Sequence, residues 1–425
     1  MPRRVLNVHK SSKDVTARST SEYPNQGAQF LSVYRSRIVL DGSPVRLKGV
    51  NLGGWLMPEG YILHAPNRAH SLFRKDFVRG LGEAAYAGLE KAFRDNFITE
   101  ADIDRMRTFG FNCLRVPFHH RLVEARPFQY SRAGVGYLDR VMAWAGRRGI
   151  RVILDMHAAP GAQNHDWHSD AEGGRMRFWS GKANQRRAIA LWEFLADRYK
   201  DEPAVAGYDI LNEPVLEDAA PLNRYYRAAI RAVRSIDRNH IIFIEGNRWA
   251  QDLACLDDFA DENLALSMHF YEPFEFAFNL EPHWRYPLVN KSGRWDRGFM
   301  LRRLETLKAE ADRRGRPLWC GEFGVNARDG AAGEDRWLKD ILAHFGALDI
   351  HWTYWTWKAV KHYMFPDGIF SYYPNSPWVN RAGPDYGWET WKRHWPARKK
   401  DMIASWRLDK FDLNRKIAEV LHEKV

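Results

Sequence analysis

Cysteine is scarce in this sequence, which has three among its 425 residues: Cys113, Cys255 and Cys320. Three cysteines cannot all pair within one chain, so the sequence argues against a disulfide framework. No cluster of cysteine and histidine residues has the spacing of metal ligands, and no motif calls for an organic cofactor. We therefore expect no metal and no cofactor.

Long apolar runs are also missing. No stretch of eighteen or more apolar residues occurs, so we expect no membrane span. The first ten residues carry basic side chains, but no apolar segment follows them, and we expect no signal peptide. On this basis we expect a cytoplasmic protein, or a secreted or periplasmic one if a leader has been removed before residue 1.

Acidic side chains are in the minority, with 53 Asp and Glu against 64 Lys and Arg and a net charge of +11. No recognisable nucleic-acid-binding module accompanies this charge, so nucleic acid is not an expected partner. The positive charge is compatible with two interpretations: a basic surface without a particular partner, or an anionic polysaccharide as partner. The 18 tryptophans favour a carbohydrate partner, because sugars stack their apolar faces on indole rings, although core packing also uses tryptophan.

Residues 1–34 are polar and basic without hydrophobic periodicity, and we expect them to form a flexible arm. A hairpin is predicted over Arg37–Lys48, turning at Asp41-Gly42. No internal repeat or long low-complexity segment follows, so we expect residues 35–425 to form a single catalytic domain. Nothing in the sequence specifies an oligomeric state.

After the hairpin, short apolar runs alternate with amphipathic segments. The predicted strands are Leu47–Asn51, Asn112–Pro117, Arg151–Met156, Val205–Leu211, His240–Glu245, Leu264–His269, Leu318–Gly321 and His351–Trp355. The predicted helices are Glu100–Phe109, Val135–Arg148, Gln185–Arg198, Leu222–Ile236, Leu301–Arg313, Glu334–Phe345 and Asp409–His422. Eight strands separated by helices predict a (β/α)8 TIM barrel. An open doubly wound sheet is the alternative, but no glycine-rich dinucleotide-binding motif follows the first strand.

Four connections after predicted strands are long: Leu52–Ile98, Ala158–Ala183, Glu272–Phe299 and Lys358–Lys400. In a barrel they all rise from the C-terminal face, where barrel enzymes carry their chemistry. We expect aromatic residues of these connections to wall a deep site: Trp55, Tyr61, Trp167, Trp179, Trp284, Trp295, Tyr363 and Trp378. Candidates to line the same cleft from the second connection are His165, Asp166, Trp167 and His168.

Polar or aromatic residues stand at nearly every predicted strand end. They are Asn51, Arg115, His157, Asn212, Glu213, Glu245, His269, Tyr271, Glu322 and Trp355. Strand ends that were buried only for stability would not need so many titratable groups. Their convergence on one face of the barrel predicts a functional site.

Two of these residues, Glu213 and Glu322, could supply the two facing carboxyl groups that cleave a glycosidic bond. Glu213 is the candidate acid/base, whose pKa must be raised while substrate is bound. Pro214 restricts the preceding residue to extended geometry, which we expect to fix the direction of Glu213. Asn212 is placed to hydrogen-bond the 2-hydroxyl group of a sugar.

Glu322 is the candidate nucleophile. A nucleophilic carboxylate must stay ionised, and Arg115 and Tyr271 can supply the cationic and hydrogen-bonding neighbours that it needs. Because a strand has a period of two residues, Cys113 shares a face with Arg115 and Cys320 shares one with Glu322. We expect both cysteines to fill the barrel interior.

His157 and His269 each follow an apolar run, where a neutral imidazole can hold a sugar hydroxyl group or tune a carboxylate. A satisfied core histidine is the alternative for each. The aromatic run over residues 352–357 predicts a stacking platform. We favour Trp355 as the floor of the subsite beside the cleaved bond and Trp357 as the second choice, with at least one of the three tryptophans in the core.

The ordered set of motifs resembles glycoside hydrolase family 5, in the clan of (β/α)8 retaining glycosidases. The motifs are Lys48-Gly49-Val50-Asn51-Leu52-Gly53-Gly54-Trp55, Asn112-Cys113-Leu114-Arg115-Val116-Pro117, Asp155-Met156-His157-Ala158-Ala159-Pro160-Gly161, Leu211-Asn212-Glu213-Pro214, His269-Phe270-Tyr271, Gly321-Glu322-Phe323-Gly324 and Tyr354-Trp355-Thr356-Trp357-Lys358. The segments after Asn51 and His157 look most like the exo-β-1,3-glucanase branch.

The resemblance implies that Glu213 is the acid/base and Glu322 the nucleophile. It also implies that the −1 sugar is surrounded by Arg115, His157, Asn212, His269, Tyr271 and Trp355. We therefore expect a retaining β-glycoside hydrolase acting on an oligo- or polysaccharide, with a β-glucan or β-glucoside as substrate and β-1,3-glucan favoured. The alternatives are a transglycosylase, an endo-β-1,4-glucanase and a sugar-binding barrel without turnover.

Overall fold

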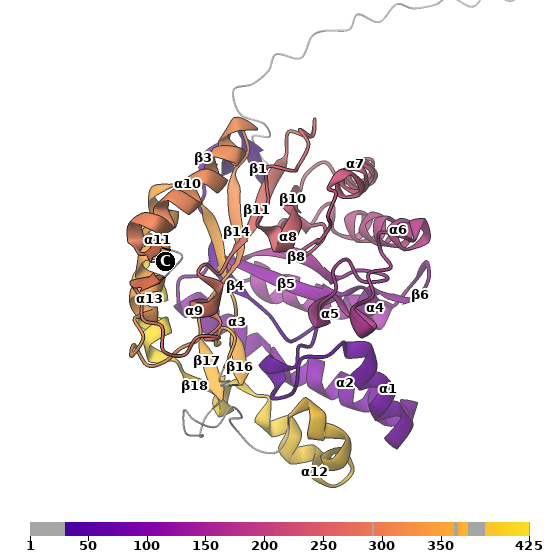
Figure 1. Ribbon diagram of the computed structural model, residues 1–425. Coiled ribbons are helices and arrows are strands. Elements are labelled where there is room, and N and C mark those ends of the chain that lie inside the picture. Colours follow the sequence, from indigo (N-terminus) through magenta and orange to yellow (C-terminus); the bar gives the residue numbers. More distant parts are fainter. Residues whose placement is uncertain (1–29, 291–292, 361–363, 373–386, 425) are drawn as a thin grey trace, which may run out of the picture.

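Eight parallel strands close into a barrel at the centre of the computed structural model, which describes residues 30–290, 293–360, 364–372 and 387–424 (Figure 1). In chain order the barrel strands are β4 (Lys48–Asn51), β5 (Cys113–His119), β8 (Arg151–Ala158), β9 (Val205–Asp209), β10 (Ile241–Glu245), β11 (Leu264–Phe270), β14 (Leu318–Phe323) and β15 (His351–Tyr354). The predicted TIM barrel is confirmed, and each strand lies where the sequence indicated. The open doubly wound alternative is wrong, because β15 pairs with β4 and closes the sheet.

Amphipathic helices cover the outside of the barrel. They include α3 (Glu100–Thr108), α5 (Arg132–Gly146), α6 (Lys182–Tyr199), α7 (Ala220–Arg234), α10 (Arg297–Arg313) and α11 (Glu334–Ala347). In α7, for example, Tyr226, Ala229 and Val233 are buried at the three- and four-residue spacing of one helix face. Within the described ranges, no helix has both the length and the apolar character needed to cross a membrane.

A small antiparallel sheet closes the N-terminal end of the barrel. It consists of β1 (Leu31–Tyr34), β2 (Arg37–Leu40) and β3 (Ser43–Pro44), so the predicted hairpin is present. Leu31 and Ile38 pack against inward-facing residues near the strand starts, including Cys113 and Trp319. Strand β1 lies inside the stretch that the sequence assigned to a flexible arm, and this part of the assignment is wrong. Residues 1–29 of the arm lie outside the described residues.

The predicted inward direction is correct for Cys113 and wrong for Cys320. Cys320 belongs to the cluster that packs strands against helices, whereas Trp319 faces the barrel interior. The pairing of β11 with β14 shifts register between Met268 and His269, where a bulge interrupts the two-residue period. Because of this bulge, Glu322 faces the interior although Cys320 faces the helices.

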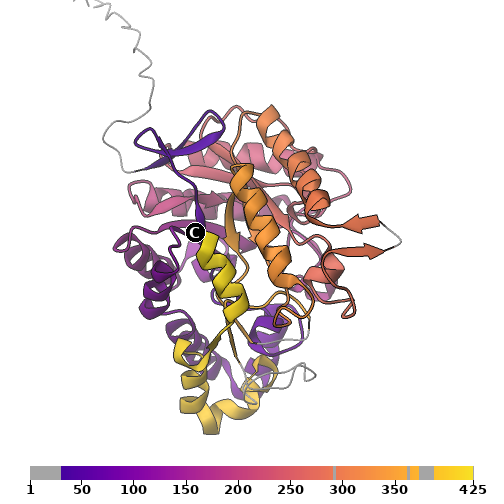
Figure 2. The same ribbon diagram turned by 90° about the vertical axis from the view of Figure 1, so that its left-hand side faces the viewer.

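The longest connections form a layer beyond the C-terminal end of the barrel (Figures 1 and 2). Its elements are α1 (His70–Leu81), α2 (Glu83–Phe97), β16 (Lys358–Val360), β17 (Phe370–Tyr372), α12 (Trp391–Ser405) and β18 (Asp412–Leu413). Aromatic contacts hold the elements of this layer together: Phe73 packs against Trp388, and Phe93 packs against Trp391.

The final helix α13 spans Arg415–Lys424 and lies beside α11 (Figure 2). Its predicted start at Asp409 is wrong. The residues before the helix have other structures: Leu408–Lys410 form a short 3₁₀ turn, and Asp412–Leu413 form β18, which pairs with β17.

Candidate active site

A cavity of about 610 Å³ opens at the carboxyl ends of the barrel strands. Its lining includes four carboxyl groups, two histidines and several aromatic rings. The residues are Glu59, Tyr61, His157, Asp166, Trp167, His168, Glu213, Arg248, Trp249, Gln251, Tyr271, Phe274, Phe278, Glu322, Trp355, Phe365 and Pro366. The expected convergence of strand-end residues on the C-terminal face is therefore observed.

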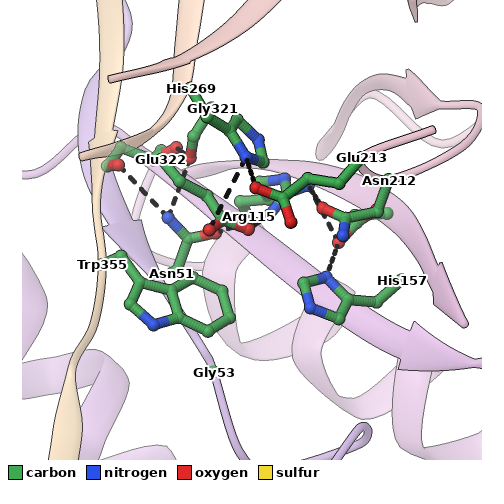
Figure 3. Close-up of polar contacts among 12 residues, drawn as sticks. Asn51, Gly53, Arg115, His157, Asn212, Glu213, His269, Gly321, Glu322 and Trp355 are labelled. Carbon is green, nitrogen blue, oxygen red and sulfur yellow. Dashed lines mark hydrogen bonds and ion pairs between the residues drawn. The ribbon is translucent and has the colours of Figure 1, made fainter. Parts of the chain in front are cut away.

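Glu213 and Glu322 face each other in this cavity (Figure 3). One oxygen of each carboxylate and one nitrogen of His269 all lie within 4.8 Å of one another. Glu322 projects from β14, and Glu213 follows the end of β9. Two residues that are distant in sequence thus form one pair, as predicted.

Glu322 is held by hydrogen bonds at both oxygens. Nη1 of Arg115 donates to Oε1 at 2.5 Å, and the hydroxyl group of Tyr271 donates to Oε2 at 2.9 Å. The sequence predicted both neighbours. These two contacts engage both carboxylate oxygens and fix the orientation of the side chain toward the cavity.

Arg115 connects the site to the barrel interior and is fully buried. Its Nε lies 3.0 Å from Asp209, and its Nη2 lies 3.0 Å from Asp155 and 3.1 Å from Glu245. Burial raises the pKa of Asp155 to about 8 although the charge of Arg115 opposes the change. Arg115 thus places one positive charge in contact with three buried acids of the barrel interior.

Replacing Arg115 by Met should lower the free energy of unfolding by about 3–5 kcal/mol, because buried carboxylates would lose their cation. Chemical denaturation would measure the change. The control is Arg198→Met, which removes a cation whose side chain is 43% exposed in its ion pair with Asp139; this change should cost less than about 1 kcal/mol. Equal losses for the two variants would contradict the special role of Arg115.

The backbone of Glu213 differs from the prediction. The sequence predicted extended geometry before Pro214, but Glu213 has φ of 44°, in the left-handed region. Its backbone N–H donates to Oε2 of Glu245 at 2.6 Å, and this tertiary hydrogen bond holds the conformation that the local preference disfavours. Strained backbone of this kind concentrates at functional sites.

Two histidines flank the Glu213 carboxylate. Nδ1 of His269 lies 2.7 Å from Oε1, and Nε2 of His168 lies 3.3 Å from Oε2. Burial alone would raise the pKa of Glu213, but the hydrogen bond from His269 and the charges of His168 and His269 lower it below its usual value. The proton that an acid at this position needs therefore resides mainly on the neighbouring histidines.

His269 also approaches two other acids, with Nε2 at 3.2 Å from Glu245 and Nδ1 at 3.7 Å from Glu322. Burial disfavours its charged form, but Glu245 and Glu322 outweigh burial and raise its pKa well above the usual value. Glu213, His269 and Glu322 are close enough to hold a metal ion. Their arrangement does not fit one, because Arg115 and the Tyr271 hydroxyl group already donate hydrogen bonds to both oxygens of Glu322.

His157 and Glu59 also line the cavity, with 3.9 Å between Nε2 of His157 and Oε1 of Glu59. Nδ1 of His157 shares a hydrogen bond of 2.7 Å with Asp155, and burial lowers the pKa of His157 to about 3, so its imidazole is neutral. Glu59 accepts a hydrogen bond from Trp167 at 3.0 Å, and burial raises its pKa to about 8. The sequence pattern did not indicate Glu59, which is marked only as an acid that follows the Asn51–Trp55 motif.

Trp355 lines the cavity as predicted, with its ring nearly parallel to that of His157 at 5.5 Å between centroids. Its Nε1 donates to the hydroxyl group of Tyr61. Trp357, the second choice, is fully buried and donates to Asp102 at 2.9 Å, so it belongs to the core.

Some of the predicted loop residues line the cavity and others do not. Tyr61, Asp166, Trp167 and His168 line the cavity as expected. Residues that do not line it are Trp55, His165, Trp179, Trp284 and Trp295. Tyr363 and Trp378 lie outside the described residues. Four further rings complete the wall although no sequence pattern predicted them, namely Trp249, Phe274, Phe278 and Phe365.

A (β/α)8 barrel whose C-terminal face carries two facing carboxyl groups in an aromatic-walled cavity defines a glycoside hydrolase. A family model described as Cellulase (glycosyl hydrolase family 5) matches residues 80–361. The chain belongs to glycosyl hydrolase family 5, and it is a glycosidase that hydrolyses O-glycosyl bonds. Its substrate is accordingly a carbohydrate.

Several curated relatives carry glycosidase names. A "Beta-xylosidase" of Phanerodontia chrysosporium is 34% identical over 346 residues, which cover 78% of this chain and 71% of the relative. An "Endoglucanase C" of Acetivibrio thermocellus is 26% identical, covering 75% of this chain and 92% of the relative. A "Probable glucan 1,3-beta-glucosidase A" of Aspergillus niger is 28% identical, covering 61% of this chain and 62% of the relative.

Solved structures support the fold. Endoglucanase Cel5A from Thermotoga maritima superposes with a TM-score of 0.59 at 19% identity, covering 88% of this chain and 96% of that one. The cellulose synthase subunit Z from Clostridioides difficile gives a TM-score of 0.60 at 16% identity, covering 89% of this chain and 99% of that one. At these identities the likeness establishes the barrel architecture.

Proposed function

We propose that this glycosidase works by double displacement, with Glu322 as nucleophile and Glu213 as acid/base, on a β-glucan or β-glucoside. One observation carries the mechanism: oxygens of the two carboxylates lie within 4.8 Å of each other. Retaining enzymes place their carboxyl groups about 5–5.5 Å apart, whereas inverting enzymes leave about 6.5–9.5 Å for a water molecule. The close approach supports retention.

In the first step, Glu322 forms a bond to the anomeric carbon while Glu213 protonates the departing glycosidic oxygen. In the second step, Glu213 takes a proton from water, which displaces Glu322 and releases the sugar with its original configuration. Arg115 and Tyr271 stabilise the Glu322 carboxylate before attack and again when it departs.

The residues around this pair are suited to the −1 sugar. Oδ1 of Asn212 accepts a hydrogen bond of 2.7 Å from Nη2 of Arg115. The buried Nδ2 of Asn212 has no hydrogen-bond partner among the described residues, which leaves that donor for a sugar hydroxyl group. His157 and His269 supply further polar contacts. The Trp355 ring offers an apolar face to the sugar ring.

The substrate is most consistent with a neutral glycan. The relatives' names include an endoglucanase and glucan 1,3-β-glucosidases, and the sequence motifs favour β-1,3-linked glucose. Four lining residues are acids, while Arg248 is the only lysine or arginine among the described lining residues. The names of these relatives, rather than the charge of the site, support a neutral glycan, because the charged imidazoles of His168 and His269 offset the acids around the reacting bond.

A panel of glycans tests the substrate class. We expect the highest kcat/KM on β-1,3-glucan or short β-1,3-oligosaccharides, compared with β-1,4, β-1,6 and β-1,2 glucans and with aryl β-glucosides, and product sizes would separate exo from endo action. Aryl β-xyloside belongs in the panel because of the β-xylosidase relative. A clear preference for β-1,4-glucan with mixed oligomeric products would favour the endoglucanase alternative instead.

Transglycosylation uses the same covalent intermediate, with a sugar hydroxyl group in place of water. Product analysis at high acceptor concentration distinguishes the two reactions: we expect free sugar to remain the main product. Products longer than the substrate, formed in preference to free sugar, would assign the protein as a transglycosylase.

A further inference from the structure

His168 is the second histidine at the Glu213 carboxylate, and neither step of the proposed double displacement uses it. It lies in the short 3₁₀ helix Trp167–Ser169, within the long connection after β8, and is buried. The two oxygens of Glu213 face different histidines, Oε1 facing His269 and Oε2 facing His168. Two imidazoles thus face one carboxylate, and the role of each has to be assigned separately.

The two imidazoles differ in the number of carboxylates that lie close to them. His269 lies within 4 Å of three carboxylates, those of Glu213, Glu245 and Glu322. His168 lies within 4 Å of two, with Nε2 at 3.3 Å from Glu213 and 3.5 Å from Asp166. Because fewer anions retain its proton, His168 is the neighbour that can release one to Glu213 more easily.

Asp166 is fixed in a position to orient His168. Its Oδ2 accepts a hydrogen bond of 2.7 Å from Nε1 of Trp249, and its backbone N–H donates to Asn164 at 2.9 Å. Burial opposes ionisation of Asp166, but the hydrogen bond and charge of His168 lower its pKa to about 2, so it remains an anion. An ordered anion beside Nε2 keeps the imidazole next to Glu213.

The other groups that face His168 agree with a charged imidazole. Glu59 approaches from the first long connection, and the His157 ring from β8 lies 5.6 Å away and is neutral. Burial disfavours charge on His168, but Asp166, Glu213 and Glu59 together raise its pKa to about 9. His168 therefore carries a proton from the pH at which Glu213 ionises up to about pH 9.

We propose that His168 is a positioning residue that holds the proton for Glu213 and passes it to Oε2 when a glycoside binds. The Nε2–H bond breaks as an Oε2–H bond forms, and Glu213 then gives this proton to the departing oxygen while Glu322 bonds to the anomeric carbon. In the second half of the cycle, Glu213 takes a proton from water and returns it to His168, so the protons balance. This inference rests on the proposed function, which assigns the acid role to Glu213.

The test is the variant His168→Asn, assayed on two substrates. An unactivated β-glycoside needs a proton on its leaving oxygen, whereas a dinitrophenyl β-glycoside does not. We expect kcat/KM to fall about 10- to 100-fold on the first and less than about 3-fold on the second. The alkaline limb of the kcat/KM profile on the unactivated substrate should move at least about one pH unit lower in the variant. The reason is that the raised pKa of His168 keeps its proton available up to higher pH in the wild type.

The matched control is His165→Asn, since His165 lies in the same connection but does not line the cavity and has a 46% exposed side chain. We expect its profile to match the wild type. Asp166→Asn serves as a second variant if His168→Asn does not fold, and it should shift the same limb in the same direction by a smaller amount.

Equal losses of His168→Asn on both substrates, or an unmoved alkaline limb, would overturn the inference and leave His168 as a packing residue of the loop. An unaffected enzyme would overturn it as well. A wild-type enzyme inactive on both substrates would instead contradict the proposed function, so the two failures can be told apart.

Discussion

Replacing Glu322 by Gln should lower kcat on a β-glycoside by about 10⁴-fold or more, while binding of the same glycan persists. The amide keeps the size of the side chain and can still meet Tyr271, but it carries no charge to attack the anomeric carbon. Steady-state kinetics and calorimetric titration with an oligosaccharide measure the two quantities. The loss should be the same on activated and unactivated substrates, because both need the nucleophile.

The control is Glu275→Gln, an exposed glutamate in α9 (Phe274–Ala277) near the mouth of the cavity that does not line it. We expect this variant to retain wild-type kinetics. If wild type and Glu322→Gln were equally inactive on every β-glucan tried while both bound sugar, the barrel would act as a sugar-binding protein without turnover.

Replacing Glu213 by Gln should show a different dependence on the leaving group. We expect kcat/KM on an unactivated glycan to fall about 10²- to 10⁴-fold, because the departing oxygen loses its proton donor. A dinitrophenyl β-glycoside should still form the covalent intermediate on Glu322, which then persists because water lacks its base. Pre-steady-state release of dinitrophenol followed by slow turnover is the expected signature.

Added azide provides the decisive comparison for Glu213, because this anion needs no base to attack the intermediate. We expect azide to restore turnover of Glu213→Gln on the dinitrophenyl substrate and to yield the β-glycosyl azide. With Glu322→Gln, which lacks the nucleophile, added azide should yield no β-glycosyl azide. Equal losses of Glu213→Gln on both substrates with no azide effect would contradict the acid/base assignment.

The barrel and most of its site could be predicted because their signals are local. Buried parallel strands read as short apolar runs, and functional residues stand at their ends. The partnership of Arg115 and Tyr271 with Glu322 followed from the same placement, and the structure confirms both contacts.

What the sequence missed depends on tertiary contacts. The Glu245 side chain holds Glu213 at a positive φ against the preference of a residue before proline. A bulge beside His269 turns Glu322 inward and Cys320 outward. No periodicity encodes either effect, since each arises from a neighbour on another strand.

The loops were the least predictable part of the site. His168 was a candidate for the cleft, but only the folded connection brings its ring to Glu213. Glu59 and the rings of Trp249 and Phe274 enter the cavity from connections without a repeating pattern. Such segments are positioned by packing on a rigid scaffold, so their roles emerge only when the scaffold is known.

The central claim is that Glu322 bonds covalently to the sugar during a retaining reaction. The most direct test is trapping with a 2-deoxy-2-fluoro-β-glucoside that carries a dinitrophenyl leaving group, followed by mass spectrometry of the proteolysed enzyme. We predict one added fluoroglucosyl group per chain, on the peptide that contains Glu322. A label on a different residue, or rapid turnover with inverted product and no adduct, would contradict the account.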